Sequence, residues 1–194
     1  NQAQLHAFHT LNLPGEQVKR SLANSAAIIA LPESHEDIVR AGIMLYGVAP
    51  FPGKTGRDFG LKPVMRFYSM VSAIHHYPAG ARVGYGGTWQ AAQDSVIAVV
   101  AVGYGDGYPR HILANTPVLV NGQTTAIVGR VSMDLTIVDV TDVPGVELGD
   151  IVTLLGAQDG LCLRAEELAA QIETISYEIV TGISARVPRV HITA

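Results

Sequence analysis

The pair Asn121-Gly122 restricts the fold more than any other feature, because it stands between two apolar runs rich in β-branched residues. These runs are Pro117 to Val120 and Ala126 to Val131. Asn and Gly adopt positive φ values readily, and a two-residue hairpin turn requires such values. The arrangement therefore predicts a β-hairpin with its turn at 121–122, and antiparallel structure around it.

The same alternation of apolar runs and turn residues extends through most of the chain after residue 60. We expect further strands at Met65 to Tyr77, Val96 to Val102, Leu135 to Val140, Asp150 to Leu155, Ile175 to Val180 and Val187 to Ile192. One amphipathic helix is predicted at Arg164 to Ile172. This part of the chain is therefore expected to be mostly β.

The first sixty residues follow a different pattern, in which helix-forming and apolar segments alternate. The segments are a helical Pro14 to Ala23, a strand-like Ala26 to Leu31, an amphipathic Glu33 to Arg40 and an apolar Gly42 to Tyr46. Such alternation is typical of the βα units of a parallel sheet. Proline and glycine gather at 50–60, so we place a domain boundary near Leu61, between an α/β part (1–60) and a β domain (61–194).

The composition excludes several classes of partner. Lys and Arg number 13 against 17 Asp and Glu, which gives a net charge of −4 without any basic run, so nucleic-acid binding is not expected. No apolar segment approaches the roughly 20 residues that cross a bilayer, and the start of the chain has no secretory pattern. We therefore expect a soluble, cytoplasmic protein that does not bind membranes. The low charged fraction of 15% indicates a covered interface.

Metal and disulfide chemistry are also not expected. Cys162 is the only cysteine, so it can form neither an internal disulfide nor a multi-cysteine metal site. The seven histidines lack metal-ligand spacing, because the adjacent His75 and His76 point to opposite faces of a strand.

Six short motifs contain residues suited to an active site. They are Asn24-Ser25-Ala26-Ala27, Arg40 to Gly47 (RAGIMLYG), Val83 to Trp89 (VGYGGTW), Val102 to Arg110 (VGYGDGYPR), Ile127 to Asp134 (IVGRVSMD) and Ile175 to Glu178 (ISYE). Any one of the glycine-flanked tyrosines also fits an ordinary turn. In this order and spacing, however, the motifs resemble the C-terminal half of alanine racemases that use pyridoxal 5′-phosphate. The resemblance implies the last βα units of a (β/α)₈ barrel in residues 1–60, followed by a mostly β domain in 61–194.

The resemblance implies a role for each residue that faces the substrate. Tyr85 matches the tyrosine that takes the Cα proton from the L-isomer, because racemisation needs one base on each face of the reacting carbon. The backbone amide of Met133 meets the substrate carboxylate, and Tyr104 and Asp134 line the entrance. The second base is the cofactor lysine of the family's N-terminal half. The three lysines here lie outside every motif, so we expect a half-enzyme that is inactive alone.

The cofactor contacts follow from the same resemblance. Arg40 matches the arginine that meets the pyridine nitrogen, and a guanidinium cannot hand over a proton, so that nitrogen stays unprotonated. The phosphate is expected to meet the Ser25 hydroxyl, backbone N–H groups of Gly42 and Ile43, and the Tyr177 phenol. Ser21 stands where many members of the family carry a histidine that supports the arginine.

The function implied is the interconversion of L-alanine and D-alanine, which supplies D-alanine for peptidoglycan. The family's sites are shared across a homodimer, so Tyr85, Tyr104, Met133 and Asp134 would act on the partner's cofactor. Three alternatives stay open: a non-catalytic β-barrel binding module, a broad-specificity amino-acid racemase, and an amino-acid decarboxylase of the same two-domain plan. The decarboxylase ranks last, because it would use a loop cysteine and Cys162 lies outside the motifs.

Overall fold

The structure is a computed structural model that describes residues 2–11 and 18–192. The chain divides into two compact units, Asn1–Leu61 and Lys62–Ala194. Among the described helices, none combines the length and the apolar character needed to span a lipid bilayer.

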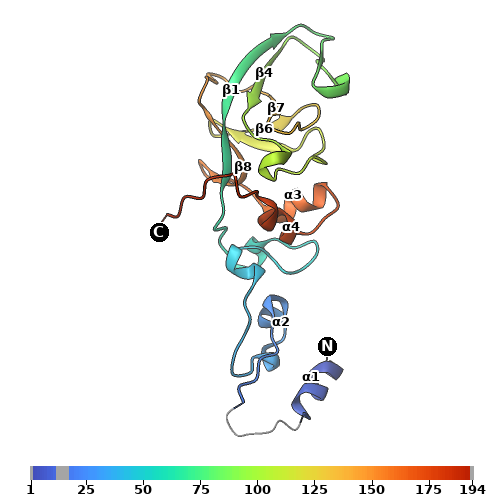
Figure 1. Ribbon diagram of the computed structural model, residues 1–194, viewed down its shortest axis with the longest axis vertical. Coiled ribbons are helices and arrows are strands. Elements are labelled where there is room, and N and C mark those ends of the chain that lie inside the picture. Colours follow the sequence, from blue (N-terminus) through green and yellow to red (C-terminus); the bar gives the residue numbers. More distant parts are fainter. Residues whose placement is uncertain (1, 12–17, 193–194) are drawn as a thin grey trace. The chain divides into compact units, whose positions relative to one another are not determined.

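A closed sheet of six antiparallel strands forms the body of the second unit (Figure 1). The strands follow one another in the order β1 (Phe67–Tyr77), β4 (Ser95–Val100), β7 (Thr136–Asp139), β6 (Gln123–Ile127), β5 (Pro117–Val120) and β8 (Ile151–Gln158). Strand β1 closes the barrel because residues 67–70 pair with β8 and residues 71–77 pair with β4. Strand β9 (Leu161–Leu163) extends β8 as a hairpin, and β2 (Arg82–Val83) pairs separately with β3 (Trp89–Gln90).

The predicted hairpin is confirmed. Strands β5 and β6 pair with Val120 opposite Gln123, and both turn residues have positive φ, 48° at Asn121 and 71° at Gly122. Strands β4, β5, β6, β7 and β8 carry apolar side chains that are at most 1% exposed: Ile97, Val100, Val118, Leu119, Val120, Ile127, Val138, Val152 and Leu154. Burial of each such side chain contributes about 1.5–3 kcal/mol to folding.

Two helices, α3 (Ala165–Gln171) and α4 (Ser176–Gly182), pack against each other after the last strand (Figure 1). The helix expected at Arg164 to Ile172 is confirmed as α3. The strand expected at Ile175 to Val180 is wrong, because this segment forms α4. Ile179 is the buried residue of α4, while Ile175 stays exposed, so only one helical face enters the core. Val187 to Ile192 forms no strand either.

The first unit contains two α-helices, α1 (Gln2–His9) and α2 (Ser25–Ala30). It also has three 3₁₀ helices, η1 (Pro32–Ser34), η2 (Ile43–Tyr46) and η3 (Gly56–Phe59). The segments before α2 and before η2 run parallel, joined by a bridge between Asn24 and Arg40. The Arg40 N–H donates to the Ala23 carbonyl at 2.8 Å. An extended segment, a helix and a second parallel segment therefore follow one another, as in a βα unit, although only a single bridge joins the two segments.

The boundaries expected within this unit are wrong by several residues. Ala26 to Leu31 forms α2 rather than a strand, because Asn24 caps a helix there by accepting a hydrogen bond from the Ala27 N–H at 3.0 Å. The segment Glu33 to Arg40, expected to be amphipathic and helical, contains only the last two residues of η1. The apolar segment Gly42 to Tyr46 forms η2. The helix expected at Pro14 to Ala23 lies partly outside the described residues, and residues 18–23 are not helical.

Candidate functional site

Ser25 is the first residue of α2, and it is only 4% exposed. Its Oγ accepts hydrogen bonds from two backbone N–H groups, those of Gly42 at 2.9 Å and Met44 at 3.4 Å. These bonds occupy both acceptor positions of the hydroxyl. No acceptor for the hydroxyl hydrogen is found in the described part of the chain, so Ser25 retains one donor for a ligand.

The backbone beside Ser25 offers a second donor. The Ile43 N–H has no acceptor among residues 2–11 and 18–192, whereas the Gly42 N–H is already bound to Ser25. A Cβ placed on Gly42 would meet Ser25 Oγ at 3.7 Å and no other atom within 4 Å, so the main chain is open to approach. The Ser25 hydroxyl and the Ile43 N–H are therefore suited to donate hydrogen bonds to an anion. The Gly42 N–H could join them only as a bifurcated donor, because it already donates to Ser25 Oγ.

Arg40 is held by the segment that runs parallel to it. Its Nη1 donates to the Ser21 carbonyl at 2.9 Å and to Ser21 Oγ at 2.8 Å, and its Nη2 donates to the Leu22 carbonyl at 3.3 Å. Two further N–H groups, on Nε and Nη2, have no acceptor in the described ranges. The guanidinium is thus fixed on one side and keeps two donors for another group.

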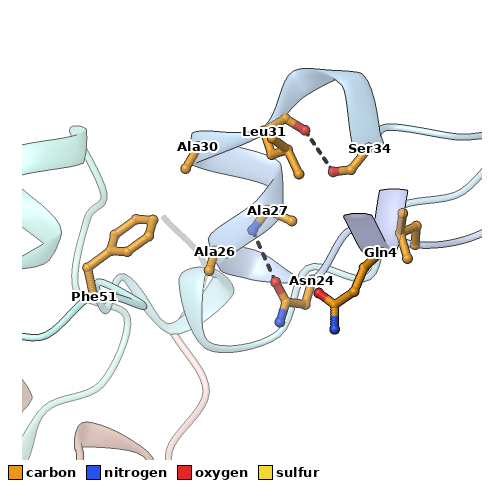
Figure 2. A pocket seen from close by; sticks show the side chains of 9 residues that line it. Gln4, Asn24, Ala26, Ala27, Ala30, Leu31, Ser34 and Phe51 are labelled. Atoms are coloured by element: carbon orange, nitrogen blue, oxygen red, sulfur yellow. Dashed lines mark hydrogen bonds between the residues drawn. The ribbon is translucent and has the colours of Figure 1, made fainter. Parts of the chain in front are cut away.

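A cavity of about 340 Å³ lies between α1 and α2. Its lining residues are Gln4, Leu22, Asn24, Ala26, Ala27, Ala30, Leu31, Ser34 and Phe51 (Figure 2). The lining side chains of Asn24 and Ser34 are turned to nearby backbone, at Ala27 and Leu31 (Figure 2). The anion donors Ser25 and Ile43 are not part of this lining, so the cavity is not the site that the sequence predicts.

In the second unit, Tyr85 projects from a tight turn of three residues, η4 (Tyr85–Gly87), and is 72% exposed. Gly84 and Gly86 have φ values of 78° and 75°, which few other residues adopt. Arg82 fixes the turn by donating from Nη1 to the Gly87 carbonyl at 2.8 Å. The Tyr85 hydroxyl has no partner in the described structure, so it is free to meet a ligand.

The turn of Tyr85 lies against the backbone that leads to Met133. A Cβ on Gly84 would come within 3.7 Å of the Arg130 nitrogen and 3.8 Å of the Gly129 Cα. Four residues further along, the Met133 N–H has no acceptor within residues 2–11 and 18–192, and Met133 is 52% exposed. The Met133 amide is therefore available to an incoming acceptor, such as a carboxylate.

Tyr104 lies on a loop that is stacked on the Met133 loop. The Tyr104 N–H donates to the Ser132 carbonyl at 3.0 Å, and the Gly105 N–H donates to the Met133 carbonyl at 2.8 Å. A Cβ on Gly103 would approach the Ser132 carbonyl to 2.3 Å, so only glycine allows this close contact. The structure thus brings Tyr104 and Met133 together, as the sequence predicts for one site.

Arg186 joins these two loops through an ion cluster that the sequence analysis missed. Its Nε donates to Asp106 Oδ1 at 2.8 Å, and its Nη2 donates to Asp134 Oδ1 at 2.8 Å. These bonds, first to Asp106 and then to Asp134, raise the pKa of Arg186. Asp106 in turn accepts from the Gly103 N–H at 2.9 Å. The only sequence signal was the place of Asp106 and Asp134 in two of the motifs.

The remaining predicted contact, Tyr177, lies on α4 and is half-exposed. Its hydroxyl has no partner among the described residues. Tyr177, Tyr85, Tyr104, Met133 and Asp134 belong to the second unit, whereas Ser25, Arg40, Gly42 and Ile43 belong to the first. Within the described ranges, no three His, Cys, Asp or Glu side chains are grouped so that they could hold a metal ion.

Two family models match the chain. Residues 64–191 match the model described as "Alanine racemase, C-terminal domain", and residues 1–50 match "Alanine racemase, N-terminal domain". The fold class is therefore the one predicted, a fragment of a (β/α)₈ barrel followed by a mostly β domain.

Similar proteins carry the same name. An alanine racemase of Legionella pneumophila (strain Lens) is 53% identical over 96% of this chain and 51% of its own length. One of Nitrosomonas eutropha is 49% identical over 98% of this chain and 50% of its own length. The crystal structure of the biosynthetic alanine racemase from Pseudomonas aeruginosa superposes with a TM-score of 0.88 at 41% identity, covering 99% of this chain and 52% of that one. The chain thus spans about half the length of the relatives it matches.

Proposed function

The chain belongs to the alanine racemase family, and from this premise we propose that it forms the C-terminal half of an enzyme that interconverts L-alanine and D-alanine with pyridoxal 5′-phosphate. One observation supports this most directly. A free tyrosine hydroxyl, that of Tyr85, and a free backbone amide, that of Met133, are presented by segments that contact each other. A proton-transfer group and a carboxylate-binding group are the two elements that an amino-acid racemase needs beside its cofactor.

The substrate would be held and deprotonated by these loops. The Met133 N–H donates a hydrogen bond to the substrate carboxylate, a group that is not itself changed by the reaction at Cα. Tyr85 then takes the Cα proton of L-alanine, and returns a proton to the same face when D-alanine reacts. Tyr104 and Asp134, on the stacked loops, line the entrance through which the substrate reaches Tyr85 and Met133. The short side chain of alanine suits a narrow approach.

The residues of the first unit fit the cofactor. The Ser25 hydroxyl and the Ile43 N–H would donate to its phosphate, and Gly42 would let the phosphate approach the main chain. From the second unit, Tyr177 would add its phenol. Arg40 would donate one of its free N–H groups to the pyridine nitrogen and, because a guanidinium cannot hand over a proton, would leave that nitrogen unprotonated. When bound, pyridoxal phosphate supplies the electron sink that makes the Cα proton of an amino acid acidic.

We assign the two units of the chain to different parts of the family fold. We assign residues 1–60 to the end of the family's barrel and residues 61–194 to its β domain. The lysine that binds the cofactor would be supplied by the N-terminal half, as Lys19, Lys54 and Lys62 lie in none of the motifs. A homodimer would place Tyr85, Tyr104, Met133 and Asp134 over the partner's cofactor. The D-alanine produced would serve peptidoglycan synthesis in the cytoplasm.

Exchange of the Cα hydrogen in D₂O tests this function in the complete polypeptide. The wild-type protein is expected to incorporate deuterium into both isomers and to interconvert them. Tyr85→Phe removes the base on one face, so exchange into L-alanine should fall by about 10²–10⁴-fold, while exchange into D-alanine continues through the lysine.

The matched control is Tyr68→Phe, which alters another exposed tyrosine, on β1 and outside all motifs. It should behave like the wild type. Equal exchange into both isomers by Tyr85→Phe would refute the role of Tyr85. A wild-type protein that binds alanine without any exchange would instead support a binding module.

A further inference from the structure

Arg186 is the only residue found to bond to both the Tyr104 loop and the Met133 loop through its side chain, within the described ranges. It comes from the segment after α4, and it meets Asp106 and Asp134 with two nitrogens of the same planar guanidinium. A planar fork with two fixed directions sets the spacing of the two carboxylates, which a flexible ammonium would not do.

The segment that carries Arg186 is itself anchored. The Ser184 N–H donates to the Asp106 carbonyl at 2.9 Å, and Arg189 donates to the carbonyls of Ser184, Ile183 and Val187. The contact with the Tyr104 loop is very close, because a Cβ on Gly105 would lie 2.6 Å from Arg186 Nη2. Arg186 therefore reaches the two carboxylates from a fixed base.

Apart from Arg186, few contacts join the Tyr104 loop and the Met133 loop. The Met133 turn closes on itself through Ser132 and Leu135, and two backbone hydrogen bonds join it to the Tyr104 loop. The side chains of Tyr104, Met133 and Asp134 are exposed, so they add little packing to these two hydrogen bonds. Asp134 also follows Met133 directly, and its unpaired charge would oppose a substrate carboxylate at the Met133 amide. Arg186 offsets that charge while it holds the loop.

We propose that Arg186 is a positioning residue, which fixes the Met133 loop through Asp134 and Asp106 and so sets the affinity for the substrate carboxylate. This inference rests on the proposed function, because it takes the Met133 N–H as the carboxylate donor. Arg186 acts on binding that the ground state and the transition state share. Its loss therefore raises KM more than it lowers kcat.

Steady-state kinetics of the complete, cofactor-loaded protein test this. Arg186→Met is expected to raise KM for L-alanine by about 10- to 100-fold with little change in kcat, since a hydrogen bond to a charged group contributes a factor of this size to binding. Arg186→Lys should recover part of the loss. Arg66→Met, which removes an arginine bonded to Thr153 on the barrel, is the matched control and should leave KM unchanged.

A double-mutant cycle shows whether Arg186 acts through Asp134. In an Asp134→Asn background, Arg186→Met should raise KM by a clearly smaller factor than in the wild type. An equal factor in both backgrounds would overturn the proposal, as would an unchanged KM in Arg186→Met.

Amide hydrogen exchange keeps the test decisive if Arg186→Met fails to fold. In Arg186→Lys, the Tyr104 and Gly105 amides should exchange at least about tenfold faster, while the β4 amides keep their rates. Unchanged exchange together with unchanged KM in this variant overturns the proposal. If the wild type does not racemise alanine, the proposed function fails, and the exchange rates alone then decide whether Arg186 holds the loops.

Discussion

Ser21 accepts two hydrogen bonds from one nitrogen of Arg40, at its hydroxyl (2.8 Å) and at its carbonyl (2.9 Å). The two residues lie on segments that run parallel, so the backbone brings them side by side. In many members of the family a histidine stands at the position of Ser21. In this chain the serine hydroxyl and carbonyl together hold Arg40 Nη1.

Ser21→Ala should therefore loosen Arg40 without releasing it, because the carbonyl bond remains. In the complete protein, we expect the affinity for pyridoxal phosphate to fall by about fivefold, the lower range for a hydrogen bond to a charged group at an exposed site. Equilibrium dialysis of the cofactor gives this value. Ser21→Thr keeps the hydroxyl and serves as the control, and equal affinities in both variants would show that the hydroxyl bond has no part in cofactor binding.

Ser25→Ala should weaken binding of the cofactor phosphate, because it removes a buried hydroxyl whose hydrogen has no other acceptor in the described chain. We expect at least about a tenfold loss of affinity for pyridoxal phosphate. Ser34→Ala is the matched control, since Ser34 is also buried in this unit but donates to the Leu31 carbonyl. It should lower the melting temperature and leave the affinity unchanged. Similar losses of affinity in both variants would mean that Ser25 acts through the fold alone.

The sequence predicts the β domain best where the conformation depends on residues that are close together in the sequence. Asn121-Gly122 defines its own turn, and the alternating strands that flank such turns need no distant information. Short apolar runs are ambiguous, because both a strand and a buried helix accept them. The apolar run Ala26 to Leu31 predicts a strand on this basis, whereas the side chain of Asn24 caps a helix there. The strand predicted at Ile175 to Val180 is also wrong, since this segment, which contains the polar Ser176 and Glu178, forms α4.

The ion cluster shows a different limit. Arg186 bonds to residues 80 and 52 positions away in the sequence, so no local pattern could indicate it. The sequence shows the motifs around Asp106 and Asp134, but only the fold shows that one guanidinium joins them. The roles of Tyr85, Arg40 and the phosphate donors came from resemblance, and they stay predictions until substitution tests them.

The buried hydroxyl of Tyr108 should make the stability of the folded chain depend on pH in the alkaline range. The ring packs against Phe67 with centroids 6.2 Å apart, and the hydroxyl has no partner among the described residues. Burial raises the pKa of Tyr108. Above pH 10 the unfolded chain therefore loses this proton while the folded chain keeps it, and the free energy of unfolding falls by about 1.4 kcal/mol per pH unit.

Tyr108→Phe should remove this alkaline dependence and should not destabilise the protein at pH 7, where losing an unpaired buried hydroxyl is neutral or favourable by about 1 kcal/mol. Urea unfolding between pH 7 and 11 measures both effects. Tyr68→Phe, at an exposed tyrosine, should keep the wild-type slope. A destabilised Tyr108→Phe variant with an unchanged slope would show that a bound water satisfies the hydroxyl.

Arg40→Glu should change which reaction the bound cofactor favours. A carboxylate opposite the pyridine nitrogen stabilises its charged form and raises its pKa, so the nitrogen would hold a proton that Arg40 cannot supply. The ring then withdraws electrons more strongly, and side reactions such as transamination become faster relative to racemisation. We expect slower racemisation, more pyruvate and cofactor amine from transamination, and a shifted absorbance spectrum.

Arg40→Lys separates the electronic effect of this substitution from the loss of the hydrogen bonds to Ser21. It keeps a positive charge but cannot reproduce the three bonds that hold the guanidinium against Ser21 and Leu22. Racemisation should slow in both variants, whereas transamination should rise only with glutamate. If Arg40→Glu alters neither the spectrum nor the ratio of pyruvate to D-alanine, then Arg40 does not contact the ring, and its bonds to Ser21 only join two parallel segments.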